Sequence, residues 1–160
     1  MKTRTVALLV VLISLLAFAA GWLAYPYLPE KIASHWDASG IANGYSSRNS
    51  ILTTTPLMIL VLGLFMLFLP RLDPLRANLA GSLATYHGMI LVTAGFLLYL
   101  QVIMVLLNLG WQVNMVMLLI PAFAVMFYFP GRMVEKARRN WFIGIRTPWT
   151  LSSRGVWKKT

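Results

Sequence analysis

The feature that most constrains this chain is the recurrence of long apolar runs that contain no charged side chain. Four such runs occur, at about Val6–Tyr25, Ile51–Leu69, Thr85–Leu107 and Met115–Phe129. A helix needs roughly 17–25 apolar residues to cross the about 30 Å hydrocarbon core of a bilayer, and a charge placed in that core is costly. We therefore predict an all-α, multi-pass transmembrane helical bundle with four spans.

Composition supports the membrane class and narrows the chemistry. The chain is 59% hydrophobic and only 11% charged, whereas soluble domains are roughly 45–50% apolar and about 25% charged. Cysteine is absent, which excludes disulfides, thiolate nucleophiles and cysteine-ligated metals. The first run has a basic start and an Ala17-Phe18-Ala19 segment that resembles a signal-peptide cleavage site. Because its apolar stretch continues to Tyr25, we interpret it as a retained membrane helix.

The distribution of Lys and Arg predicts the orientation of the spans. With the N-terminus inside, twelve of the fourteen basic residues fall in cytoplasmic segments, and only Lys31 and Arg48 fall outside. The positive-inside rule then places both termini in the cytoplasm and a loop of residues 26–50 outside. The net charge of +10 sits at the edges of the apolar runs, which is typical of proteins that contact anionic lipid. We expect the lipid bilayer as a partner and no direct contact with nucleic acid.

The external loop carries the first recognisable motif. Its residues Leu28-Pro29-Glu30-Lys31-Ile32, His35-Trp36-Asp37, Gly40 and Asn43-Gly44-Tyr45 resemble a bacterial domain of unknown function found at the N-terminus of SdpI-type membrane proteins. This resemblance implies a two-helix membrane domain over residues 1–70. Five residues are candidates for external binding: Pro29, His35, Trp36, Gly40 and Gly44.

Two residues of this loop are of metal-ligating types. His35 and Asp37 offer an imidazole and a carboxylate, but two ligands two residues apart do not make a site. We expect no metal and no cofactor, and we interpret the loop as a set of turns built around Gly40 and Asn43-Gly44, in which His35 is hydrogen-bonded to its neighbours.

The segment after the fourth run changes character. Pro130-Gly131 predicts the end of the fourth helix, and residues 131–139 predict a short basic helix on the membrane surface. Pro148 disfavours helical geometry at Thr147, and Thr150, Ser152 and Ser153 are candidate helix caps. Because Ser153 would cap a helix that has barely begun at Thr160, we expect either that this sequence is cut short of the complete protein or that it is a short variant.

Residues 140–160 carry the second motif. The run Asn140-Trp141-Phe142-Ile143-Gly144-Ile145-Arg146-Thr147-Pro148-Trp149-Thr150-Leu151, followed by Val156-Trp157, resembles the signature of the SdpI family. The resemblance implies an SdpI-like membrane region over residues 71–160 with a cytoplasmic motif at 140–160. The candidate binding residues of this motif are Asn140, Trp141, Gly144, Arg146, Thr147, Pro148, Trp149 and Trp157.

The family resemblance also implies a function. It indicates an immunity and signalling protein of the bacterial cell (inner or plasma) membrane, which protects against a secreted peptide toxin outside and recruits a transcriptional repressor inside. A small transporter or channel component is the alternative, although all four acidic residues lie outside the apolar runs. An enzyme is not expected, because no nucleophile–base pair is visible.

For several single residues, a purely structural role remains an alternative to a specific function. The aromatics of the second motif are also typical of an interfacial belt, and Arg146 is also one more cytoplasmic cation. We expect Gln101 in the third run to form a hydrogen bond between helices. We expect His87 to lie near the inner interface with its hydrogen bonds satisfied.

Overall fold

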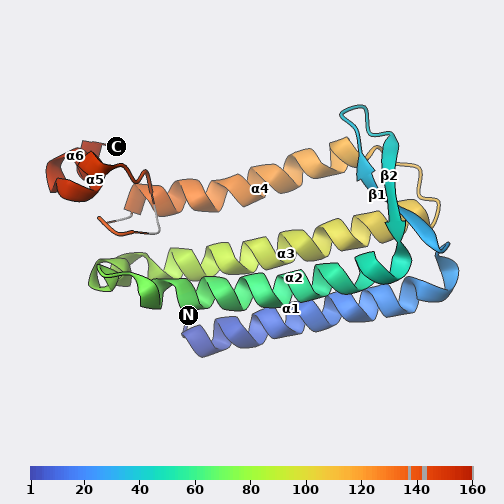
Figure 1. Cartoon of the computed structure of the whole chain (residues 1–160), viewed down its shortest axis with the longest axis horizontal. Helices are drawn as coiled ribbons and strands as arrows, with labels where there is room; N and C mark the ends of the chain where they lie inside the picture. The colour runs from blue at the N-terminus through green and yellow to red at the C-terminus, as the bar shows by residue number, and fades with distance from the viewer. Residues whose placement is uncertain (137, 142–143, 160) are drawn as a thin grey trace.

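Helices dominate the computed structural model, as the apolar runs predicted, and Figure 1 shows their order. The structure describes residues 1–136, 138–141 and 144–159, with only the backbone described at residues 80, 133, 135 and 136. The elements along the chain are α1 (Thr3–Ala24), η1 (Tyr25–Tyr27), β1 (Lys31–Trp36), β2 (Ala42–Ser47), α2 (Arg48–Phe68), η2 (Leu69–Leu72), η3 (Arg76–Ser82), α3 (Leu83–Asn108), α4 (Met115–Lys136), α5 (Pro148–Ser152) and α6 (Arg154–Lys159).

Within the described part of the chain, four helices are long and apolar enough to cross a membrane. They cover Thr3–Tyr27, Arg48–Leu72, Leu83–Asn108 and Met115–Arg132. Their helical form suits the hydrocarbon core of a bilayer, because a backbone that has no water around it must satisfy its hydrogen bonds internally. The prediction of an all-α, multi-pass bundle is confirmed.

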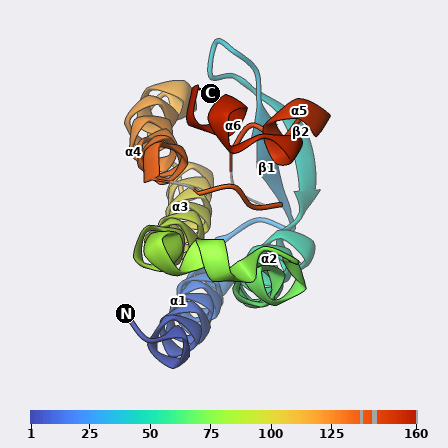
Figure 2. The same ribbon diagram turned by 90° about the vertical axis from the view of Figure 1, so that its left-hand side faces the viewer.

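Helices α1, α2 and α3 pack against one another, and α4 lies along α3 on the side away from α1 (Figure 2). Small residues bring the first helices close, because a Cβ added at Gly63 of α2 would lie 2.5 Å from Val10 of α1. Polar bonds inside the bundle go to backbone carbonyls: Ser14 donates to Pro56 (2.8 Å) and Gln101 donates to Ala17 (2.7 Å). The bond between helices predicted for Gln101 is therefore present.

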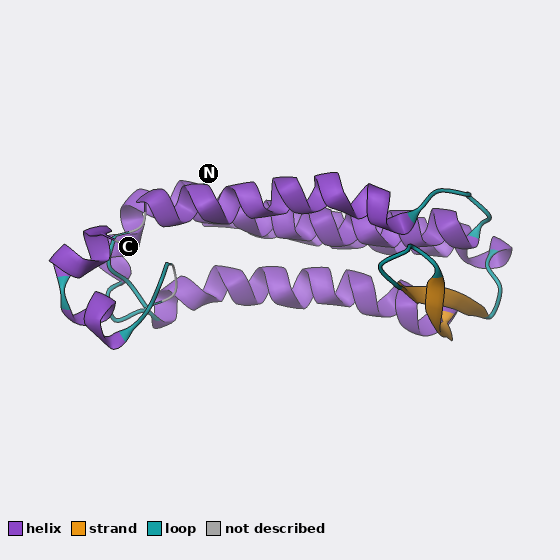
Figure 3. Ribbon diagram, turned by 90° about the horizontal axis from the view of Figure 1, so that it is seen from above, coloured by secondary structure: helices purple, strands orange, loops and turns teal. Residues whose placement is uncertain are grey.

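The connections separate into two groups at opposite ends of the bundle. The strands and the α3–α4 loop lie at one end, whereas the α2–α3 connection, α5 and α6 lie at the other (Figures 1 and 3). This arrangement places most of the basic residues at the end that holds both chain termini. It is the arrangement that the orientation prediction requires, while the orientation in a cell remains a prediction.

Two local predictions were wrong. The external loop is more than a set of turns, because β1 pairs antiparallel with β2 in a hairpin, with His35 opposite Gly44. The helix α4 also does not end at Pro130-Gly131 but continues to Lys136. A proline removes only one helical hydrogen bond, and membrane helices tolerate proline because local backbone adjustments and neighbouring groups satisfy the freed carbonyl. Residues 131–136 of the expected surface helix thus belong to α4, and Ala137 lies outside the described residues.

Candidate functional site

The second motif folds around short helices that its own side chains cap. Thr147 has extended geometry and precedes Pro148, the first residue of α5, as expected. Its hydroxyl accepts the Thr150 N–H (3.3 Å), and the Thr150 hydroxyl accepts the Thr147 N–H (2.8 Å), so the two residues form a reciprocal capping box. Ser153 caps α6 by accepting the Val156 N–H (3.4 Å), as predicted. Thr147 is therefore the N-cap of α5, and Thr150, which was predicted as a cap, stabilises the N-cap residue from within the helix.

Three further motif residues hold the segment together. Gly144 has φ of +107°, a conformation that favours glycine, and a Cβ there would lie 3.2 Å from the indole of Trp157. Asn140 is fully buried, and its side-chain amide donates to the Arg138 carbonyl at 2.7 Å. Asn140, Gly144 and Trp157 thus shape the segment from within.

Hydrogen bonds join this segment to the α2–α3 connection. Asp73 is 2% exposed, and its carboxylate accepts the N–H of Leu75 (2.7 Å) and that of Trp141 (2.9 Å). The side-chain amide of Asn78 donates to the Arg139 carbonyl at 2.7 Å. Because 68 residues separate Asp73 from Trp141, this contact was not visible in the motif. We call the bonds from Trp141 to Asp73 and from Asn78 to Arg139, which join the two segments, the Asp73–Asn78 latch.

A different group of motif side chains faces outward. Trp141, Ile145 and Trp149 are 51%, 57% and 63% exposed, although they are large and apolar. Arg146 is also exposed, and its guanidinium donates to the Trp141 carbonyl at 2.8 Å. This leaves an aromatic and cationic surface at the end of the bundle where α5 lies. The roles predicted for Arg146 and these aromatics in binding stay predictions.

At the other end, the first motif builds the hairpin. Asp37 closes the turn, because its Oδ1 atom accepts the N–H groups of Ser39 (2.9 Å) and Ile41 (3.0 Å). Gly40 has φ of +81° and lies against Asn114, and Gly44 lies so close to His35 that a Cβ would be 2.8 Å from it. His35 lies in β1 and is hydrogen-bonded through Nδ1 to the Asn43 side chain at 2.5 Å, so the predicted bond to a neighbouring residue is present although the histidine is not in a turn. Pro29 is exposed before β1.

The hairpin is fixed to the ends of the helices. Asn108, the last residue of α3, accepts the Ala33 N–H (2.7 Å) and donates to the Ala33 carbonyl (3.0 Å). Asn114 donates to the Ser39 carbonyl at 2.9 Å. The guanidinium of Arg48 lies 4.2 Å from the ring centroid of Tyr25 and donates to the Leu28 carbonyl. A two-stranded hairpin is marginal alone, so these contacts set its position.

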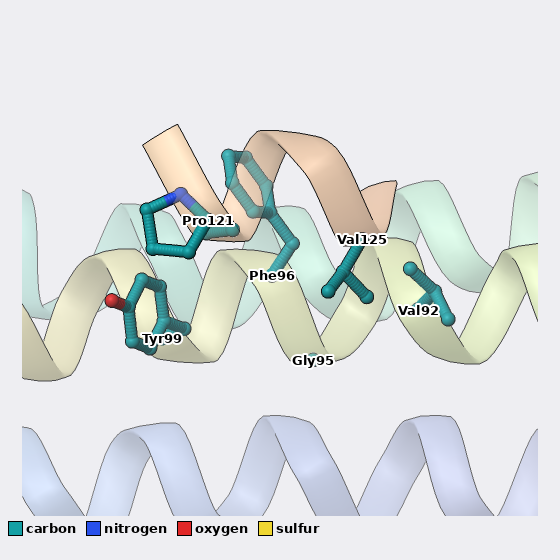
Figure 4. Close-up of a pocket in the computed structure, with 7 residues that line it drawn as sticks. Val92, Gly95, Phe96, Tyr99, Pro121 and Val125 are labelled. Atoms are coloured by element: carbon teal, nitrogen blue, oxygen red, sulfur yellow. The ribbon is translucent and has the colours of Figure 1, made fainter. Parts of the chain in front are cut away.

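Two cavities flank the contact between α3 and α4. Figure 4 shows one, in which Phe96 and Tyr99 of α3 face Pro121 and Val125 of α4, and its volume is about 440 Å³. The second, of about 450 Å³, lies between α2, α3 and α4, with β1 at its hairpin end. His35 and Trp36 line this second cavity, so the structure brings two predicted external residues to it together with Gln101.

Metal chemistry gains no support at either end. Asp37 is occupied by the hairpin turn. Among the described residues, no group of three or more histidine and acidic side chains could hold a metal ion.

Comparison with known proteins matches both motifs. The model of a domain of unknown function, DUF1648, matches residues 12–60, and the model of the SdpI/YfhL protein family matches residues 136–160. The chain is 26% identical to the immunity protein SdpI of Bacillus subtilis (strain 168) over 164 aligned positions, which cover 99% of this chain and 72% of that relative. No solved structure matches the chain. The chain therefore carries the DUF1648 and SdpI-family signatures on a multi-pass membrane bundle, as its two motifs predicted.

Proposed function

We propose that this chain is a non-enzymatic immunity protein of the bacterial cell membrane, which protects the cell from a secreted, membrane-active peptide toxin. The observation that carries the proposal is that the two motifs fold at opposite ends of one bundle of membrane-spanning length (Figure 1). The similarity to an immunity protein over 99% of the chain supports the same function.

The two ends suit different tasks under this proposal. The hairpin end faces outside, where the toxin arrives, because only two basic residues lie there. The other end faces the cytoplasm and presents Trp141, Arg146 and Trp149 on its surface. Exposed aromatics and arginine are the residue types that dominate binding energy in protein interfaces. This surface would recruit a cytoplasmic partner, and a transcriptional repressor is the partner that the family resemblance implies.

Protection is tested by expressing the chain in a sensitive bacterium and challenging it with a panel of secreted, membrane-active peptides. Survival should increase for at least one peptide relative to cells with an empty vector. Equal killing by every peptide would refute the immunity proposal. Ion or solute flux through the purified chain in liposomes, without protection, would instead support a transporter or channel component.

Recruitment at the inner end requires a separate readout. Trp149→Ala should leave protection unchanged but abolish the toxin-dependent change in transcripts of the genes adjacent to this one. Arg146→Lys should weaken the same response, because an ammonium cannot reproduce the planar donor set of a guanidinium. A normal transcript response in both variants would exclude this surface as the docking site.

A further inference from the structure

The guanidinium of Arg48, the first residue of α2, is held in a fixed orientation at the hairpin end of the bundle. It lies 4.2 Å from the ring centroid of Tyr25, and its Nη1 donates to the carbonyls of Tyr25 (3.2 Å) and Leu28. An arginine side chain has five N–H donors. Among the described residues, the donors on Nε and Nη2 of Arg48 have no hydrogen-bond partner, and neither nitrogen is buried. These oriented donors are therefore free to bind an anion.

The acidic residues near this guanidinium do not neutralise it. The Glu30 carbonyl accepts the Arg48 N–H at 2.9 Å, but the Glu30 side chain is exposed, and within the described part of the chain it forms no ion pair with Arg48. Asp37 instead accepts N–H groups of the hairpin turn. The positive charge of Arg48 is therefore available to an anion from outside the chain.

Arg48 lies where two of the membrane-spanning helices reach the same membrane surface. The first span ends at Tyr27, and the second begins at Arg48 itself. Beside it the rings of Trp22 and Tyr25 stack with centroids 6.4 Å apart, and Trp22 is 80% exposed. Tryptophan and tyrosine are enriched at the headgroup level of a bilayer, which is where the lipid phosphates lie. The free donors of Arg48 are thus at the depth of a lipid phosphate.

A groove extends into the bilayer from the same place, between α1 and α2, which lie side by side (Figure 1). We call it the α1–α2 groove. Phe18, Trp22 and Leu52 form its apolar walls, and the Tyr25 ring that lies against Arg48 is part of its lining. Phe18 lies about one helical turn deeper than Trp22. The volume of the groove is about 260 Å³, below the roughly 300–1,000 Å³ that is usual for compact small ligands, so it suits part of an alkyl chain better.

We propose that Arg48 and the α1–α2 groove bind a glycerophospholipid of the leaflet at the hairpin end. The free N–H groups of Arg48 bind the phosphate, because the planar guanidinium matches phosphate oxygens, and one acyl chain lies along Phe18, Trp22 and Leu52. A phospholipid is favoured over a peptide because its phosphate and its acyl chain already lie at the depths of the guanidinium and of the groove. The inference goes beyond the immunity function and does not depend on it.

Neighbouring threonines of α2 provide a matched pair of variants. Thr53 lines the groove, whereas Thr54 is exposed beside it and is not part of its lining. Native mass spectrometry of the detergent-solubilised chain, titrated with dioleoylphosphatidylglycerol, measures the affinity of the most tightly bound lipid. Thr53→Trp should fill the groove and lower that affinity roughly tenfold, the worth of about two methylene groups kept from burial. Thr54→Trp adds the same side chain outside the groove and should bind the lipid like the wild type.

A second pair tests the phosphate contact without filling the groove. Arg48→Gln removes the guanidinium but also its two bonds to carbonyls that precede β1. Asn108→Ala is the control, because it removes two bonds that hold β1 from α3, and Asn108 does not line the groove. Arg48→Gln should lower the lipid affinity roughly 10- to 100-fold, the worth of hydrogen bonds to a charged group, and should abolish the preference for the phospholipid over a diacylglycerol with the same acyl chains. Asn108→Ala should keep both the affinity and the preference.

Several results would overturn the inference. Equal lipid affinity in the wild type, Thr53→Trp and Arg48→Gln would refute the site. A diacylglycerol that binds the wild type as tightly as the phospholipid would exclude the phosphate contact, and an equal loss of affinity in Asn108→Ala would show that Arg48 acts only through the hairpin. Displacement of the lipid by inorganic phosphate would identify a site for free anions, and displacement by a leucine-rich peptide but not by phosphatidylethanolamine would identify a peptide site. None of these measurements uses toxin survival, so a failure of the immunity proposal is seen separately.

Discussion

The Asp73–Asn78 latch gives a prediction whose size follows from its geometry. One oxygen of the Asp73 carboxylate accepts the Leu75 N–H, and the other accepts the Trp141 N–H. Asp73→Asn keeps the shape of the side chain but replaces one of these acceptors by an amino group. Whichever way the amide turns, one of the two N–H donors then faces another donor.

The expected cost is that of one hydrogen bond to a charged group. Such a bond contributes about 1.5–3 kcal/mol, and each 1.4 kcal/mol changes an equilibrium constant tenfold. Asp73 is 2% exposed, so water cannot readily replace the lost acceptor. The open form of the segment that contains the second motif should therefore become roughly 10- to 100-fold more populated in Asp73→Asn.

Hydrogen exchange followed by mass spectrometry measures that population. Amides of residues 144–159 should exchange roughly 10- to 100-fold faster in the variant, while those of α1 and α2 should be unaffected. Trypsin provides an independent readout, because cleavage at the exposed Arg146 should accelerate in parallel.

A matched control lies at the other end of the molecule. Asp37 accepts both of its N–H donors through a single oxygen, so Asp37→Asn can keep both bonds while removing the same charge. Its hairpin should exchange like that of the wild type. If Asp73→Asn also leaves residues 144–159 at wild-type exchange rates, the carboxylate does not hold the second motif and the reasoning is wrong.

Three further predictions concern local geometry. Gly144→Ala should loosen the second motif by about 1–3 kcal/mol, measured by exchange of residues 144–159, because φ there is +107° and a Cβ would contact an indole. Gly110→Ala is the control, because Gly110 has φ of +98° but no atom lies within 4 Å of the added Cβ. If the two substitutions raise local exchange by the same factor, the contact with the indole contributes nothing. Gly63→Ala should lower the thermal stability of the detergent-solubilised bundle by about 1–3 kcal/mol through overpacking. Adding Val10→Ala should restore part of that loss, and no recovery would contradict the predicted clash. Asn108→Ala should loosen the hairpin by removing two bonds to the backbone of β1, so the amides of residues 31–47 should exchange faster. Exchange rates equal to those of the wild type would show that other contacts hold the hairpin.

Local sequence features determined much of the second motif. The extended geometry of Thr147 follows from the steric effect of Pro148. The cap that Ser153 provides for α6 follows from the need of helix N–H groups for an acceptor. These effects act over a few residues, so they are visible in the sequence. At Pro130 the local pattern predicted the wrong helix end, because α4 continues through this proline to Lys136.

The sequence by itself determined the class of the protein, the spans and the family signatures, because bilayer thickness and the cost of buried charge act on composition and length alone. Only the tertiary structure decided which side chains meet across long separations. Asp73 meets Trp141 across 68 residues and Asn108 meets Ala33 across 75, and neither pair has a periodic or local pattern. The cavity beside Gln101 belongs to the same group, because its walls come from α2, α3, α4 and β1, and its shape exists only once these elements pack.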